Sequence, residues 1–482
     1  MGTFYENNQM SLGATDLSEV VSGNLRKSSY TISVKLEAEE DKYMLLHGYT
    51  GAIDVVSENV VKYLDNVNNP DSRDTKVSES TFNALKARGY LTGKTEEEEI
   101  AHVRKLANLL HQKNKILHKN FLFLVAYDCN FRCSYCYEKN VLKNSRQWSK
   151  KVFTKDMVDK AYRTITSIVN DKRLYSQWIT LYGGEPLLGA NKEIVEYIVN
   201  KGIESGYKFM AVTNGYDLDK FIHLLSPNKI NTLQITIDGT KEHHDKRRMH
   251  FQTGQSFDQI VANIGLAIKK EINIKIRVNT DATNFDDIEL LEQIFNKLGY
   301  FNYPKLSIYS APIFNHYQTQ KSNIHFMSQT EFEQRHKNID LKYQCGVTYL
   351  AQNLYKAVID KKLVDFSSVY CSAQYGMYIL DPFGEIYSCW EDVGNRNMVI
   401  GNYINDTIQW TNMLDLWHNQ NVANSEKCIN CEYVFFCKGG CIARRVVQDG
   451  KFGAGFCNSF SHTFEYAVNL VYQKLYKNKI TS

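Results

Sequence analysis

The chain has 482 residues, and its 57 basic and 53 acidic side chains give a net charge of +4, too balanced to favour nucleic acid as a partner. Its length exceeds one ordinary hydrophobic core and predicts two or three domains. No apolar run approaches the roughly 20 residues of a membrane span, and the first 28 residues lack a secretory signal. We therefore expect a soluble, cytoplasmic protein with no membrane partner.

The cysteines are the most informative residues of the composition. There are eleven, an odd number, and they concentrate in two regions of the chain. Disulfides in a secreted protein usually give an even count, whereas clustered cysteines in a cytosolic protein favour metal binding.

The first 115 residues divide into a tail and a small module. Residues 1–28, rich in Asn, Ser, Gly and Thr, predict a mobile tail. Residues 29–115 predict an α+β module with a strand over 30–36 and helices that begin near 57, 78 and 95. Such a module is suited to docking a leader peptide, or equally to serving as a structural lid.

Residues 116–315 alternate between strand-like and helix-like segments. Apolar runs lie at 121–126, 177–182, 207–213, 232–237, 273–279 and 305–310, and helical patterns lie at 154–170, 191–204, 217–225, 256–270 and 284–298. This alternation predicts an α/β fold with a parallel sheet and right-handed crossovers. Six units fit an open, partial (β/α)6 barrel better than a closed eight-stranded one.

Three cysteines, Cys129, Cys133 and Cys136, follow the first of these strands at a C-x3-C-x2-C spacing. A short loop at the end of a strand can turn three thiolates toward one iron–sulfur cluster and leave one iron open to a small molecule. A partial zinc site or three reduced thiols would give the same spacing.

The motif C-x3-C-x-aromatic-C, with Tyr135 as the aromatic, resembles the signature loop of the radical S-adenosylmethionine (radical SAM) superfamily. The resemblance implies a [4Fe-4S] cluster whose open iron binds the amino and carboxylate groups of SAM. It also implies reductive cleavage of SAM to a radical that takes a hydrogen atom from the substrate, and a six-unit partial β/α barrel.

The end of the second strand carries Gly183, Gly184, Glu185 and Pro186, which resemble the GGEP motif of this superfamily. The two glycines allow close approach of the backbone to a ligand, and Glu185 offers an acceptor for an ammonium group. By resemblance, these residues contact the amino group of SAM.

The third and fourth strands end in Thr213-Asn214 and in Thr236 and Asp238, which resemble the superfamily's TNG and S-x-D-G motifs. Their hydroxyl, amide and carboxylate groups could bind a ribose, although both segments also read as ordinary turns.

Two arginines are candidates for the SAM carboxylate, because a guanidinium binds a carboxylate bidentately. Arg248 ends a segment that resembles the superfamily's H-D-x-x-R, and Arg277 lies on the fifth strand. The pattern does not choose between them, and either could be a solvated surface charge.

Residues 316–365 predict a helical linker that contains Cys345, and residues 366–482 hold the remaining cysteines. Their spacing resembles the SPASM domain of radical SAM enzymes that modify peptides and proteins, which holds two auxiliary [4Fe-4S] clusters. Carried over by position, Cys428, Cys431, Cys437 and Cys457 would hold the distal cluster, and Cys371, Cys389 and Cys441 the nearer one. Cys345 is a candidate fourth ligand of the nearer cluster, which is otherwise open to water or substrate; a structural zinc ribbon is the alternative.

A predicted hairpin over 377–380 and 386–389 would bring Cys371 and Cys389 together. Glu391 and Asp392 follow directly, and either could act as a general base beside the nearer cluster or be only a surface acid.

These patterns together predict a partial (β/α)6 barrel with an N-terminal α+β recognition module and a C-terminal SPASM domain, holding three [4Fe-4S] clusters and SAM. The implied activity is crosslinking of a precursor peptide with a leader sequence through a thioether, carbon–carbon or ether bond. A flavodoxin or ferredoxin would supply electrons. The alternatives are an anaerobic sulfatase maturase that forms formylglycine, and a non-enzymatic scaffold stabilised by metal.

Overall fold

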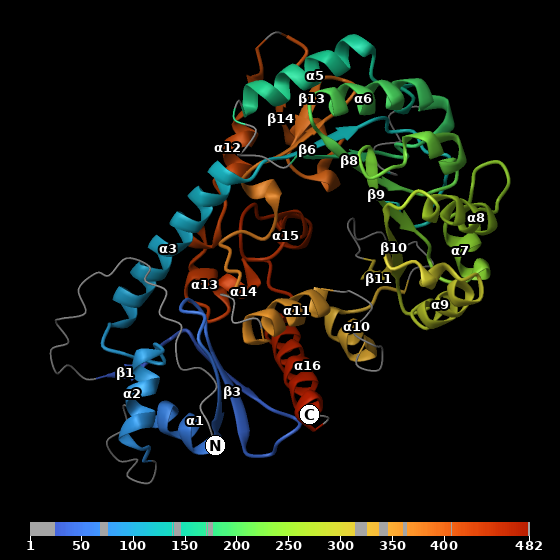
Figure 1. The fold of residues 1–482 in the computed structure, drawn as a ribbon. Coiled ribbons are helices and arrows are strands. Elements are labelled where there is room, and N and C mark those ends of the chain that lie inside the picture. Colours follow the sequence, from blue (N-terminus) through green and yellow to red (C-terminus); the bar gives the residue numbers. More distant parts are fainter. Residues whose placement is uncertain are drawn as a thin grey trace.

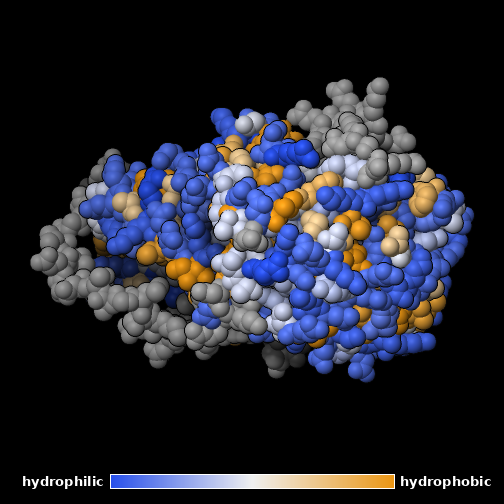
Figure 2. All heavy atoms as spheres, turned by 90° about the horizontal axis from the view of Figure 1, so that it is seen from above, coloured by the Kyte–Doolittle hydropathy of each residue, from blue (hydrophilic) through white to orange (hydrophobic). Residues whose placement is uncertain are grey.

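The computed structural model describes residues 25–67, 76–136, 138, 146–169, 171, 177–313, 325–336, 346–359, 364–405 and 407–480 (Figure 1). None of the helices in these ranges is long and apolar enough to cross a membrane. On the face seen in Figure 2, hydrophilic side chains predominate and hydrophobic ones occur in small groups, as on most globular proteins.

A ten-stranded sheet forms the centre of the fold. Its order is β11-β10-β9-β8-β7-β6-β12-β13-β14-β15. Neighbouring strands from β6 to β11 pair in parallel, which confirms the large parallel sheet predicted from the alternating pattern. The six strands are β6 (Asn120–Leu124), β7 (Trp178–Tyr182), β8 (Lys208–Thr213), β9 (Ile230–Thr236), β10 (Asn273–Thr280) and β11 (Leu306–Pro312).

Helices connect these parallel strands and bury their apolar stripes against the sheet. Their buried residues join the strand side chains in one large core that includes Ile165, Ile198, Ile264 and Leu291. The expected helix over 217–225 is instead a 3₁₀ helix, Leu218–Leu224. The helices of this part are α4 (Arg146–Ser149), α5 (Lys155–Ile168), α6 (Lys192–Glu204), α7 (Lys241–Arg247), α8 (Phe257–Ile268) and α9 (Asp287–Lys297).

The cysteine-rich C-terminal region continues the same sheet. Its first strand, β12 (Met377–Leu380), pairs in parallel with β6, and β13 (Glu385–Tyr387) returns antiparallel to it as the expected hairpin. Local sequence patterns gave no sign of the pairing with β6. The further elements are β14 (Val399–Asn402), β15 (Gln409–Trp410), α12 (Asn412–His418), α13 (Glu426–Ile429), α14 (Val434–Cys437), α15 (Ile442–Asp449) and α16 (Phe460–Ile480).

The N-terminal module is a three-stranded antiparallel sheet followed by helices. Its sheet has the order β2 (Thr31–Lys35), β3 (Lys42–His47) and β4 (Ile53–Ser57), of which only the first strand was expected. Residues 26–27, assigned to the tail from sequence, form the short strand β1 (Arg26–Lys27), which pairs with β5 (Leu91–Thr92). The helices are α1 (Glu58–Asn66), α2 (Glu79–Ala87) and α3 (Glu96–Leu117).

Helix α3 and a core shared with α16 join the module to the rest of the chain. Helix α3 begins with a capping box between Thr95 and Glu98 and runs from the module to the start of β6. In Figure 1, α16 lies beside the blue strands of the module, and Phe464 and Val468 of this helix share a core with Ile32 and Val34. The helices α10 (Gln329–His336) and α11 (Gly346–Ile359) pack against α16.

Candidate active site

The loop that carries Cys129, Cys133 and Cys136 begins directly after β6. Backbone hydrogen bonds from Arg132 and Ser134 to the carbonyls of Met249 and Arg247 tie it to the segment that follows α7. The Sγ of Cys129 accepts a hydrogen bond from the Phe131 N–H at 3.3 Å. The loop therefore has a defined shape, fixed by a segment more than a hundred residues away.

Burial is the main reason why the thiols of this loop resist ionisation. It raises the pKa of Cys129 well above its usual value, with a further contribution from Cys133, and it raises the pKa of Cys136 to about 12. A bound metal reverses this tendency, because a cation stabilises the thiolate. Among the described residues, no three His, Cys, Asp or Glu side chains converge on the position of a single metal ion. The ligands of a cluster each bind a different iron, so they need not converge in this way.

Gly183 and Gly184 place the end of β7 directly against the strand that precedes the cysteine loop. A Cβ at Gly184 would lie 2.5 Å from the carbonyl oxygens of Tyr127 and Asp128, and Gly183 has a φ of 142°. The N–H groups of Gly184 and Glu185 donate to the carbonyls of Ala126 and Asp128. The two glycines therefore allow a close approach to the chain's own backbone, and their predicted approach to a ligand stays a prediction.

Glu185 is 1% exposed and joins the ends of β7 and β8. Its carboxylate accepts from the Thr213 hydroxyl at 2.6 Å, from the Asn214 N–H at 2.6 Å and from the Leu187 N–H at 2.8 Å. Burial raises its pKa to about 7 despite these donors. Because a carboxylate offers about four acceptor positions, about one remains for a ligand. Pro186, also buried, follows in the same turn.

The side chain of Asn214 reaches the cysteine loop itself. Its Nδ2 donates to the Oδ1 of Asn130 at 2.7 Å and lies 3.8 Å from the Sγ of Cys129. The sequence identified Asn214 only as a ribose-binding candidate, and it did not single out Asn130.

Tyr135 is the centre of a buried polar network. Its hydroxyl donates to Asp238 at 2.6 Å and accepts from Arg248 at 2.8 Å and from Asn279 at 3.1 Å. The Nε of Arg277 donates to the Oδ1 of Asn279 at 2.8 Å, so both candidate arginines belong to this network. Thr236, 7% exposed, lies at the end of β9 beside it.

The two arginines differ in one respect that bears on ligand binding. Arg248 is 8% exposed, and its Nε has no hydrogen-bond partner among the described residues. Burial opposes its charge, but Cys133, Tyr135 and Asp238 hold its pKa well above the usual value. Because an unpaired buried donor is costly, Arg248 is prepared to receive an acceptor such as a carboxylate.

A third arginine, Arg247, also belongs to this network, although the sequence favoured Arg248 and Arg277 over it. Arg247 donates to Asp281 at 2.7 Å and to Asp238 at 3.3 Å, and to the carbonyl of Asn279 at 3.1 Å. Asn279 and Asp281 could have been found, because they stand where β10 ends, at the same edge of the sheet as the other site residues.

The C-terminal cysteines form two groups. After burial, the charges of Cys428, Cys431 and Cys457 raise the pKa of Cys437, to about 12. In the second group, burial and then Cys441 raise the pKa of Cys371 to about 12, and Cys371 in turn raises that of Cys389. The assignment of these cysteines to two auxiliary clusters stays a prediction. Cys345 lies outside the described residues.

The second group of cysteines lies beside the site on the parallel strands. Trp390, next to Cys389, packs against Tyr182 at the end of β7, with ring centroids 5.5 Å apart. Glu391 influences the pKa of Cys371 and of Cys389, and burial and then Glu391 raise the pKa of Asp392 to about 7.

A cavity of about 510 Å³ connects the cysteine-rich region with the parallel sheet. Its lining includes Cys437, Cys441 and Tyr370 on one side and Pro312, at the end of β11, on another. The space is large enough for several side chains of a bound molecule.

Comparison with known proteins is consistent with this geometry. A family model described as the radical SAM superfamily matches residues 123–297, from β6 to α9. The chain is 22% identical over 365 residues to the cysteine-type anaerobic sulfatase-maturating enzyme of Clostridium novyi (strain NT), covering 71% of this chain and 93% of that one. It is also 22% identical over 466 residues to the radical SAM cyclopropyl synthase TigE of Paramaledivibacter caminithermalis, covering 87% and 90%.

Among solved structures, native anSMEcpe with bound AdoMet and Cp18Cys peptide superimposes with a TM-score of 0.54 at 17% identity. The superposition covers 74% of this chain and 98% of that one. At this level of identity the likeness establishes the fold alone.

Proposed function

This chain belongs to the radical SAM superfamily and is a radical SAM enzyme, and from that premise we propose that it crosslinks residues of a ribosomally made precursor peptide. Its similarity to a cysteine-type anaerobic sulfatase-maturating enzyme supports a role in modifying a polypeptide. We place the reaction in the cytoplasm, with a flavodoxin or ferredoxin as the electron donor.

Cys129, Cys133 and Cys136 would hold the [4Fe-4S] cluster that the superfamily implies, with SAM bound beside it. When bound, this pair supplies a 5′-deoxyadenosyl radical that removes a hydrogen atom from the substrate. The unpaired Nε of Arg248 fits the SAM carboxylate, and the free acceptor position of Glu185 fits its amino group. Arg277 would then orient Asn279 rather than bind SAM directly.

The other residues of the site would orient these ligands and exclude water. Asn214, at the end of β8, donates a hydrogen bond to Asn130 of the cysteine loop. It would therefore keep the nucleoside of SAM and the cysteine loop in a fixed position relative to each other. Arg248 donates to the Tyr135 hydroxyl, which in turn donates to Asp238, and this chain of hydrogen bonds keeps Arg248 in place. Such fixed donors and acceptors position a reactive group without reorganisation during the reaction.

We further propose that the parallel strands form a partial (β/α)6 barrel and that residues 366–482 are a SPASM domain with two auxiliary [4Fe-4S] clusters. Cys428, Cys431, Cys437 and Cys457 would hold one, and Cys371, Cys389 and Cys441 the other, with Cys345 as its candidate fourth ligand. Glu391, whose charge raises the pKa of Cys371 and of Cys389, or its neighbour Asp392 would accept a proton from the substrate.

The observation that favours a peptide crosslinking enzyme over a sulfatase maturase is the N-terminal module docked on the cysteine-rich region. Tyr30 donates to the carbonyl of Ile429 at 2.6 Å, Arg104 of α3 binds Glu426 at 2.9 Å, and His111 contacts the carbonyl of Gln374 at 2.9 Å. A module held in this way is able to present a leader peptide while the core of the peptide enters the site. Formylglycine formation remains the second candidate because of the similarity to sulfatase-maturating enzymes.

Metal analysis of the anaerobically purified chain tests the cluster assignment. We expect about twelve irons per chain, the sum for three four-iron clusters, and about eight after Cys133→Ala, Cys389→Ala or Cys437→Ala. Only Cys133→Ala should abolish reductive cleavage of SAM. Zinc in place of iron would refute the radical mechanism, and a loss of all iron from each variant would support a metal-stabilised scaffold instead.

Co-production with a short peptide encoded beside the gene tests the product. Mass spectrometry should find a peptide that has lost two hydrogen atoms per crosslink and has lost a protease site between the joined residues. A cysteine that has lost its sulfur and two hydrogen atoms and gained one oxygen atom would instead identify formylglycine formation.

A further inference from the structure

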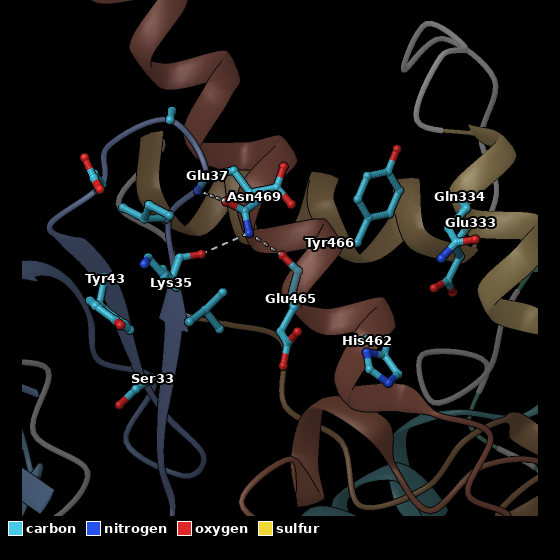
Figure 3. A pocket seen from close by; sticks show the side chains of 14 residues that line it. Ser33, Lys35, Glu37, Tyr43, Glu333, Gln334, His462, Glu465, Tyr466 and Asn469 are labelled. Carbon is cyan, nitrogen blue, oxygen red and sulfur yellow. Dashed lines mark hydrogen bonds between the residues drawn. The ribbon is translucent and has the colours of Figure 1, made fainter. Parts of the chain in front are cut away.

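A groove lies where the N-terminal module meets the C-terminal helix, away from the cysteines. It has a volume of about 880 Å³, in the range of sites that hold drug-sized ligands, and its lining comes from β2, β3, α10 and α16 with the turn after β2 (Figure 3). One wall is β2 and the turn after it, including Lys35 and Glu40; the other is α10 with Glu333 and Gln334.

The floor of the groove is one stripe of α16. Glu465, Tyr466 and Asn469 lie three, four and seven residues after His462, so the four side chains lie on the same face of the helix. Figure 3 shows this face between β2 on one side and α10 on the other. The opposite stripe, with Phe464 and Val468, is buried in the core shared with β2.

The side chain of Asn469 fixes the width of this groove. Its Nδ2 donates to the carbonyl of Lys35 at 3.2 Å, and its Oδ1 accepts from the N–H of Glu37 at 2.8 Å. The same Nδ2 also bonds the carbonyl of Glu465 within α16 at 3.1 Å. The strand end and the helix are therefore held together, so the groove is a formed feature of the fold.

Negative charge dominates the lining. Four carboxylates, those of Glu37, Glu40, Glu333 and Glu465, face one ammonium group, that of Lys35. Glu333 is buried and accepts from Thr463, whereas Glu40 and Glu465 are exposed in the groove. Tyr43 and Tyr466 add aromatic faces, which attract cations as well.

We propose that this groove binds a basic segment of the precursor peptide, with Lys or Arg side chains of the peptide against Glu40 and Glu465. The inference rests on the proposed function and specifies its partner: a leader with clustered positive charge. The chain's own first 24 residues do not suit the groove, because they contain no Lys or Arg and three acidic residues.

Fluorescence anisotropy with the full, cluster-loaded protein tests the proposal. The probe is a fluorescein-labelled peptide with three arginines separated by Ser-Gly pairs, and its counterpart has glutamates in place of the arginines. We expect the arginine probe alone to bind, with an affinity that falls as salt screens the exposed charges.

The groove variant Glu40→Gln/Glu465→Gln removes two charges and should weaken binding of the arginine probe by about fivefold, because exposed ion pairs each contribute modestly. The matched control Glu193→Gln/Glu289→Gln removes two exposed acids from α6 and α9 and should leave binding unchanged. Equal binding by both variants, or binding of the glutamate probe, would overturn the assignment.

Two further measurements separate this proposal from its alternatives. The groove variant should cleave SAM at the same rate as the unmodified enzyme. A negative result for peptide binding would therefore not count against the radical chemistry, and a lack of SAM cleavage would not count against peptide binding in the groove. A change in oligomeric state of the groove variant, measured by light scattering, would overturn the proposal in favour of contact between two copies of the chain.

Discussion

Replacing Arg248 by glutamine tests how the site would recognise the carboxylate of SAM. The side chain is 8% exposed, and its Nε lacks a partner among the described residues. A hydrogen bond to a charged group contributes about 1.5–3 kcal/mol, so its loss should weaken SAM binding by about 10- to 150-fold. Arg277→Gln is the control, because Arg277 bonds Asn279 and should have a smaller effect.

The assay is equilibrium binding of SAM to the anaerobic enzyme, with iron content measured on the same sample. Arg248 lies beside Cys133, so a variant that loses iron would report on the cluster and not on SAM. Arg248→Lys keeps the charge without the guanidinium geometry and should recover part of the affinity. Unchanged affinity in an iron-replete Arg248→Gln variant would refute the reasoning.

Two further predictions concern the surroundings of the site. Gly184→Ala should destabilise the chain by about 1–3 kcal/mol and lower its iron content, because the new methyl group meets the backbone before the cysteine loop. Gly93→Ala should be tolerated, because its methyl group would meet only the Leu25 side chain, at an ordinary contact distance of 3.9 Å. Equal denaturation midpoints of the two variants would contradict this reasoning. Burial raises the pKa of Asp381 to about 7, so its carboxyl keeps a proton that the unfolded chain releases near pH 4, and stability falls as pH rises through that window. Asp381→Asn has no such proton to lose, so its stability should not show this fall. The difference in unfolding free energy between the variant and the unmodified chain, measured by chemical denaturation, should therefore shift by about 2 kcal/mol in favour of the variant from pH 5.5 to pH 8.5. Asp219→Asn, at an exposed position, should show no such trend, and the same trend in both variants would show that Asp381 is not its source.

Much of the central fold could be predicted from the sequence because its signals are local. Alternating apolar runs and helical periodicities were sufficient to predict the six parallel strands. The polar residues of the site could then be predicted because they stand where these strands end. The helix over 217–225 became a 3₁₀ helix, and β3 and β4 were missed. Periodicity in short segments does not determine such details, since packing against neighbouring elements decides them.

Contacts between distant segments could not be read in the same way. Gly183 and Gly184 were predicted to allow a ligand to approach, and the tertiary structure adds a second reason for their small size, the close packing against Ala126 and Asp128. The sequence gave no reason to prefer Arg248 or Arg277 as the ligand of the SAM carboxylate. The tertiary structure distinguishes them, because the Nε of Arg277 donates to Asn279 whereas the Nε of Arg248 has no partner among the described residues.

The sequence by itself determined the spacing of the cysteines, the order of strands and helices, and the residues at the strand ends. Covalent spacing and local periodicity carry this information within a few tens of residues. The tertiary structure decided that β12 joins β6, that α3 and α16 bind the N-terminal module to the cysteine-rich region, and that an acidic groove lies between β2 and α16. These features depend on which buried surfaces fit together across hundreds of residues, and no local pattern specifies that fit.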